Sequence, residues 1–101
     1  MEGTMKVMVQ WEVHPDQRAE VFAAFAAMDL DDYKAQPGPT ITTIGRWHDV
    51  ANGRGVGIFE TDDQAALARV LLQWNVAVDF EISLVHDDDE AHALIREHLA
   101  E

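Results

Sequence analysis

The order of elements along this sequence predicts an α+β domain of the ferredoxin-like type. Segments 6–14 and 76–86 alternate between apolar and polar residues, which is the period of a half-buried strand. Two helical patterns and a glycine-rich hairpin lie between them, and a further helical pattern ends the chain. The resulting order, β-α-β-β-α-β plus a helix, is the split βαβ arrangement, with helices on one face of an antiparallel sheet. We therefore expect one domain over residues 1–101, with an ordered core at about 5–100.

The first half of the chain supplies one strand and one helix. The strand at 6–14 ends at His14, and Pro15 suits the first position of a helix because its missing N–H would be unpaired there anyway. This helix is predicted to run to about residue 33. The sequence QPGP at 36–39 then breaks the chain direction.

The second half supplies a hairpin, a helix, a strand and a final helix. TDDQ at 61–64 is predicted to be a capping box in which Thr61 caps the helix and Gln64 reaches back. Acidic residues crowd the start of the last segment, where a helix dipole favours them. The predicted elements are strands at 40–51 and 54–60, a helix to about residue 75, a strand at 76–86 and a helix at 87–101.

The hairpin carries the sequence GRWHDVANGRGVG at 45–57. Asn52-Gly53 predicts a two-residue type I′ turn, which places Trp47 and Asp49 on one face and Arg46 and His48 on the other. We assign the face of Trp47 to the core under the helices. The glycines are spaced G-x-G-x-G inside a strand, which indicates close packing against a neighbour and not a phosphate-binding loop.

The opposite sheet face mixes apolar and charged residues. Such a face is too apolar for open water and too polar for a monomer core, so it suits packing against the sheet of a second copy. We predict a homodimer through this face. Its predicted interface residues are Met8, Gln10, Glu12, Ile44, Arg46, Phe59, Glu81 and Val85.

The composition excludes several classes of binding partner. The net charge of −12 disfavours binding to nucleic acid and to anionic membranes, because the surface repels phosphate groups. No apolar run approaches the length of about 20 residues that spans a bilayer, and we see no signal peptide. The chain has no cysteine, which fits a cytoplasmic protein. No histidine spacing indicates a metal site, and we expect no cofactor.

Three motifs resemble a known family. The opening WEVHPDQR, the strand GRWHD and the helix start FETDD are similar to domain of unknown function 3303, and the similarity covers nearly the whole chain from Met5. The family looks like a branch of the dimeric α+β barrel superfamily. That resemblance implies a dimer whose two sheets close into a barrel with the helices outside. Members of the superfamily include cofactor-independent monooxygenases, lactone isomerases, haem-degrading enzymes and stress-induced proteins.

The resemblance also implies a ligand site between the sheet and the helices. Trp11, Trp47 and Trp74 are all predicted to point into that layer. Three tryptophans there suit the walls of a pocket for an aromatic ligand, and plain core packing is the alternative that we favour.

Three residues are candidates for moving a proton. Asp49 would suit the role of a general base if burial raised its pKa. The alternative is that Asp49 is a solvated carboxylate at the end of a strand. His48 suits proton transfer or ligand binding, and otherwise a hydrogen bond to Glu12 or Glu81 across the dimer interface. His14 is a catalyst or, alternatively, a helix cap.

The sequence MDLDDY at 28–33 breaks a local rule, because carboxylates are disfavoured at a helix C-terminus. Either Asp29, Asp31 and Asp32 have a function such as cation binding, or the helix ends near Met28 and Asp31 caps a further turn. From these observations we expect a small dimeric protein that binds a hydrophobic or aromatic molecule. The alternative is a cofactor-independent monooxygenase or isomerase that acts on such a molecule.

Overall fold

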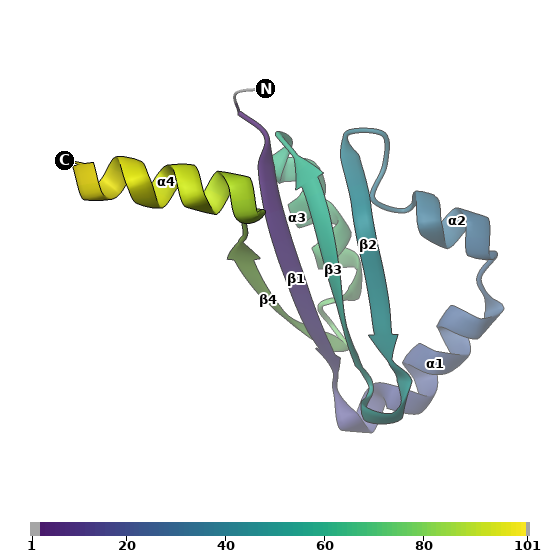
Figure 1. The fold of residues 1–101 in the computed structure, drawn as a ribbon. Helices are drawn as coiled ribbons and strands as arrows, with labels where there is room; N and C mark the ends of the chain where they lie inside the picture. Colours follow the sequence, from purple (N-terminus) through teal and green to yellow (C-terminus); the bar gives the residue numbers. More distant parts are fainter. Residues whose placement is uncertain (1–2, 101) are drawn as a thin grey trace.

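The computed structural model describes residues 3–100 and confirms the ferredoxin-like α+β fold (Figure 1). Residues 1, 2 and 101 of the predicted domain lie outside this range. The four strands form one antiparallel sheet in the order β2-β3-β1-β4. The elements are β1 (Met5–Val13), α1 (Arg18–Ala27), α2 (Leu30–Ala35), β2 (Ile41–Asp49), β3 (Arg54–Thr61), α3 (Gln64–Trp74), β4 (Val78–Leu84) and α4 (Asp88–Ala100), with 3₁₀ turns at Pro15–Gln17 and Val50–Asn52.

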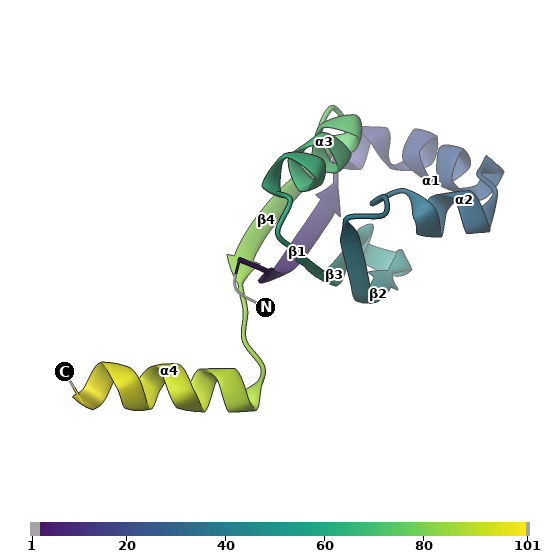
Figure 2. The ribbon, with the colours of Figure 1, turned by 90° about the horizontal axis from the view of Figure 1, so that it is seen from above.

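The helices are unevenly placed around the sheet. Figure 2 shows α1, α2 and α3 on one side of the sheet, while α4 extends away from it. We call the side under α1, α2 and α3 the covered face and the other side the open face. The core lies on the covered face and consists of buried apolar side chains from the strands and α3: Val7, Val9, Ile41, Phe59 and Leu67.

The first predicted helix is two helices in the structure. Met28 adopts an extended conformation (φ −74°, ψ 147°) and ends α1. The Asp29 carboxylate then accepts the backbone N–H of Asp32 at 3.1 Å and starts α2. The helix predicted to continue to residue 33 is therefore wrong, and the residue that caps the second helix is Asp29 and not Asp31.

The hairpin turn is longer than predicted. Asp49 pairs with Arg54, so four residues connect the strands instead of Asn52-Gly53 alone. The first three form the 3₁₀ turn, and Gly53 closes the loop in the left-handed region (φ 66°, ψ 38°). The predicted type I′ turn is wrong because the Asn52 amide donates to the Asp49 carboxylate at 3.0 Å, which stabilises a wider loop.

The predicted faces of the hairpin are inverted. Trp11 of β1 pairs with Gly55, and Gly55 pairs with His48, so all three lie on the covered face. Trp47 pairs with Val56 on the open face and is 59% exposed. The physical reason is space, because a Cβ on Gly55 would lie 2.6 Å from Cε2 of Trp11. Only glycine at that position leaves room for the indole ring against β3.

The start of α3 also differs from the predicted capping box. The Asp63 carboxylate caps the helix by accepting the backbone N–H of Ala66 at 3.0 Å. Thr61 is buried before the helix, where its hydroxyl donates to the Thr40 carbonyl at 2.8 Å and accepts the Asp63 N–H at 2.9 Å. Thr61 therefore ties the end of β3 to the start of β2.

The last helix, α4, has little contact with the rest of the chain. Lys6 forms ion pairs with Asp87 at 3.6 Å and with Glu90 at 3.0 Å, and these hold the start of the helix near β1. Beyond that point its apolar residues Leu94, Ile95 and Leu99 are exposed. Within residues 3–100, no helix is long and apolar enough to cross a membrane.

Candidate functional site

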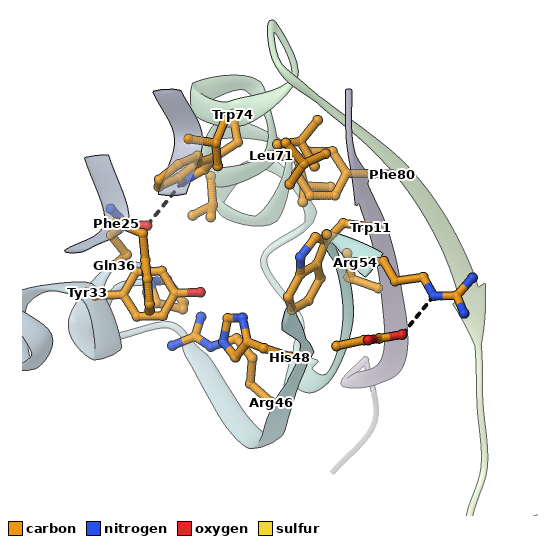
Figure 3. Close-up of a pocket in the computed structure, with 18 of the residues that line it drawn as sticks. Trp11, Phe25, Tyr33, Gln36, Arg46, His48, Arg54, Leu71, Trp74 and Phe80 are labelled. Carbon is orange, nitrogen blue, oxygen red and sulfur yellow. Dashed lines mark hydrogen bonds and ion pairs between the residues drawn. The ribbon is translucent and has the colours of Figure 1, made fainter. Parts of the chain in front are cut away.

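A cavity of about 360 Å³ lies between the covered face of the sheet and the helices (Figure 3). Its walls are mainly apolar, and its size falls within the range of about 300–1,000 Å³ that is usual for small-molecule sites. The sheet contributes Trp11 and Phe80, α1 contributes Phe25, and α3 contributes Leu71 and Trp74.

The helices do not fill this space. Phe22 and Phe25 line the cavity from α1, yet they remain 38% and 37% exposed. Large aromatic side chains normally gain stability by complete burial, so their exposure inside a concave site indicates an unfilled pocket. The cavity is therefore not a closed hydrophobic core.

One end of the cavity is polar, and His48 lies at its centre. The imidazole ring is 5.5 Å from the ring of Trp11, 5.5 Å from that of Phe25 and 6.3 Å from that of Tyr33, measured between centroids. Figure 3 shows His48, Arg46 and Tyr33 gathered below, with Trp74, Leu71 and Phe80 at the opposite, apolar end. The site thus has an amphipathic lining.

Arg46 extends over the Tyr33 ring, with its guanidinium carbon 4.2 Å from the ring centroid. This is a cation–π contact, which orients the guanidinium without using its N–H groups. Among residues 3–100 the structure gives Arg46 no hydrogen bond and no ion pair. Its donors are therefore available to a ligand.

The environment shifts two pKa values at this end of the cavity. Burial and the neighbouring Arg46 charge both lower the pKa of the His48 imidazole below its usual value. Burial raises the pKa of the Tyr33 phenol, and Arg46 opposes that shift. Both shifts favour the neutral forms at neutral pH. A neutral imidazole offers one acceptor nitrogen and one N–H donor, and the protonated phenol offers an O–H donor.

The second arginine in the cavity wall is already paired. The Nε of Arg54 donates to the Asp49 carboxylate at 3.0 Å, and the Asn52 amide donates to both oxygens of the same carboxylate. These bonds lower the pKa of Asp49, the Asn52 side chain having the larger effect. A carboxylate with a lowered pKa is a weak base at neutral pH, so this geometry disfavours Asp49 as a general base.

The structure separates the three tryptophans. Trp11 and Trp74 both line the cavity, and the indole N–H of Trp74 donates to the Gln36 side chain at 3.2 Å. Trp47 lies on the open face and takes no part in the lining. The placement of Trp47 in the layer under the helices is therefore wrong, whereas His48, assigned to the opposite face, lines the cavity.

His14 lies away from this site. Its Nε2 is 2.9 Å from the Asp79 carboxylate, and it forms no side-chain cap on the turn that follows. The residues that sequence reasoning missed are Phe25, Tyr33 and Gln36. Tyr33 and Gln36 follow the break at Met28, which separates α2 from α1.

The predicted interface residues divide between the two faces. Arg46 and Phe59 lie on the covered face, so the sheet face predicted for these two residues is wrong. The pairing places Met8, Gln10, Glu12 and Glu81 together on the open face, Ile44 at a bulge in β2 and Val85 just after β4.

The aspartates of α2 have a structural explanation in part. Asp29 caps the helix, and Asp31 and Asp32 lie in its first turn, where the dipole favours carboxylates. Across residues 3–100, no group of three or more histidine or acidic side chains is arranged to hold a metal ion.

No curated protein and no solved structure matches this chain. One family model does match, over residues 5–99, and its description is Domain of unknown function (DUF3303). Because this match covers nearly the whole chain, the protein belongs to the DUF3303 family.

Proposed function

We propose that the protein binds a small hydrophobic or aromatic molecule in the cavity between the sheet and the helices. The observation that carries the proposal is the cavity of about 360 Å³ with an aromatic lining and one polar end. In a filled core, the aromatic rings would be buried against one another. In this cavity, Phe22 and Phe25 remain partly exposed. The absence of cysteine supports a cytoplasmic site of action.

Two measurements test this proposal. Native mass spectrometry of protein purified without added ligand reports any small molecule that stays bound. Calorimetric titration with 2-naphthalenemethanol, a neutral aromatic probe, then reports binding to the empty cavity. We expect saturable binding with one probe per chain. Heat of dilution alone, both with this neutral probe and with its anionic analogue 2-naphthoate, would contradict the proposal.

A pair of variants on one helix assigns the binding to the cavity. Val70 of α3 lines the cavity, whereas Leu72 of the same helix is exposed and does not. Val70→Phe should fill part of the space and weaken probe binding, and Leu72→Phe should leave it unchanged. Equal affinities in the two variants would place the probe elsewhere.

A second candidate function is a cofactor-independent monooxygenase or isomerase. The observation that favours it is the position of His48 in the cavity wall, where burial and Arg46 lower the pKa of the imidazole. A neutral imidazole beside a bound aromatic substrate would accept a proton from it. Oxygen uptake with 1,5-dihydroxynaphthalene, above its autoxidation, tests the oxygenase form. His48→Gln should abolish the uptake, and His92→Gln on α4 should preserve it.

We further propose a homodimer through the open face, of the kind that the dimeric α+β barrel superfamily implies. Trp47 is exposed there beside Val56 and Ile58, and the apolar residues of α4 are also uncovered. The radius of gyration, 15.7 Å, exceeds the value of about 13 Å expected for a compact chain of this length, because α4 extends outward. A second copy would cover this apolar surface. Trp47→Asp should shift the mass measured by light scattering to that of a monomer.

A further inference from the structure

We propose that the ligand of this cavity is an aromatic carboxylate whose acid group binds Arg46. This inference rests on the proposed function, because it names the chemical class of the molecule that the cavity takes. The apolar end would hold the rings, and the guanidinium would hold the carboxylate. Arg46 would thus decide which aromatic molecules bind.

The first step of the argument is the charge of the wall. The cavity is lined by two arginines and one carboxylate, Asp49, while the lowered pKa of His48 leaves that side chain neutral. Arg54 and Asp49 neutralise each other at 3.0 Å. The wall therefore keeps one positive charge, at Arg46, although the chain as a whole carries −12.

The second step is that Arg46 remains unpaired in a chain rich in acids. The sequence holds 19 aspartate and glutamate residues against 7 lysine and arginine residues. Within residues 3–100, Arg46 pairs with none of them and contacts the Tyr33 ring instead. A half-buried guanidinium without a partner loses part of its hydration, and no hydrogen bond within the described part of the chain compensates for that loss. A ligand anion would supply the missing hydrogen-bond partner.

The third step is the orientation of the groups around the guanidinium. The Tyr33 ring fixes Arg46 from one side, and Figure 3 shows the Tyr33 hydroxyl pointing into the cavity. Arginine presents its N–H groups as a planar fork that matches both oxygens of a carboxylate. The phenol provides a further donor. A neutral alcohol would engage only part of this donor set.

The fourth step is the position of the rings. His48 lies among Trp11, Phe25 and Tyr33, and Trp74 faces them from α3. A flat aromatic system placed among these rings would lie with its acid substituent near Arg46. A flexible aliphatic ligand would bind these walls more weakly, because offset stacking and edge contacts form only between aromatic rings.

Calorimetric titration with two probes of one skeleton tests the inference. The probes are 2-naphthoate, which is anionic at pH 7.5, and the neutral 2-naphthalenemethanol. We expect 2-naphthoate to bind about tenfold or more tightly, since a hydrogen bond to a charged group contributes at least that factor. Arg46→Gln should abolish this preference by weakening 2-naphthoate alone. Arg69→Gln, which removes the same charge outside the cavity, should preserve it.

Arg46→Lys separates lost binding from lost folding. It keeps the charge and removes the planar fork, so the preference for 2-naphthoate should fall between those of the wild type and Arg46→Gln. Circular dichroism checks that each variant is folded. Equal affinity of the wild type for the two probes, or a preference that survives in both Arg46 variants, overturns the inference and leaves cavity binding standing. Failure of both probes to bind the wild type overturns the proposed function and the inference with it.

Discussion

The two faces of the β2–β3 hairpin differ in what lies above them, although the same two strands build both. On the covered face, Arg46 and His48 lie across from Gly57 and Gly55. The rings of Phe59 and Trp11 occupy the space that these two glycines leave. On the open face, Trp47 stands next to β-branched residues and is mostly exposed. The difference teaches that missing side chains, as much as apolar ones, decide which face of this sheet carries the cavity.

Two glycines, one on each face of the hairpin, show the same difference in packing. A Cβ on Gly55 would meet the Trp11 ring and the Trp47 backbone carbonyl, 2.7 Å away, and neither can move freely. The atoms nearest to a Cβ on Gly45 belong to the Trp47 ring, whose exposed position allows it to move aside. The covered face is therefore tightly constrained beside the cavity, and the open face is not.

The largest difference in stability between the two faces is expected when Trp11 and Trp47 are each replaced by alanine. Trp11→Ala removes a ring that packs against the core cluster and should lower the free energy of unfolding by about 3 kcal/mol. Trp47→Ala removes an exposed ring and should cost less than about 1 kcal/mol in monomer stability. Urea unfolding of both variants at low protein concentration makes the comparison. A larger cost for Trp47→Ala would mean that the hairpin faces are reversed.

The glycine pair should give the next largest difference. Gly55→Ala is expected to destabilise the fold by about 2 kcal/mol, because overpacking beside a fixed ring and a backbone carbonyl forces the sheet to shift. Gly45→Ala should cost less than about 1 kcal/mol, since the nearest atoms belong to the exposed Trp47 ring, which can move. Thermal unfolding followed by circular dichroism is the measurement. Similar midpoints for the two variants would contradict the constraint proposed for the covered face.

A smaller effect is expected at the turn that fixes the hairpin register. Gly53 has a φ of +66°, and an added Cβ would also meet the Arg18 side chain. Gly53→Val should therefore cost about 1–2 kcal/mol, the penalty for a side chain in the left-handed region. Ala51→Val in the same loop is the control, because Ala51 is exposed and has no positive φ. The prediction fails if the two variants unfold at the same urea concentration.

Local signals explain which parts of the fold were predictable. The alternation in β1 and β4 is set by the sequence within each strand, and the order of elements restricts the sheet to few topologies. These predictions were confirmed. The face of β2 and β3 depends instead on whether the Trp11 ring fits over Gly55, which is a contact between residues far apart in the chain.

The candidate site was predictable only in part for the same reason. Trp11 and Trp74 lie in elements whose faces the periodicity assigned, and both line the cavity. Tyr33 reaches the cavity because the extended Met28 breaks the helix and redirects α2. Three aspartates near this break were the visible sign, but the partner of Tyr33 is Arg46, which lies on another element.

The smallest predicted effect is on the pH dependence of folding stability, and it arises from the charge of His48. It tests whether the polar end of the cavity differs from bulk solvent as an environment for the imidazole. Burial, and then Arg46, lower the pKa of the His48 imidazole in the folded protein below its ordinary value of 6.5. The unfolded chain therefore binds a proton at a higher pH than the folded protein does, so folding stability rises with pH across this interval. The stabilisation is complete above pH 6.5 and is lost as the pH falls through the lower, folded pKa.

His48→Gln should remove this contribution and flatten the dependence of unfolding free energy on pH below 6.5. His92→Gln, on the exposed helix α4, is the matched control and should leave the wild-type dependence unchanged. The measurement is urea unfolding at a series of pH values between about 5 and 8, which spans the ordinary titration range of histidine. Parallel curves for wild type and His48→Gln would show that the imidazole titrates as it does in water. The polar end of the cavity would then be solvated, and neither burial nor Arg46 would act on His48 as the structure indicates.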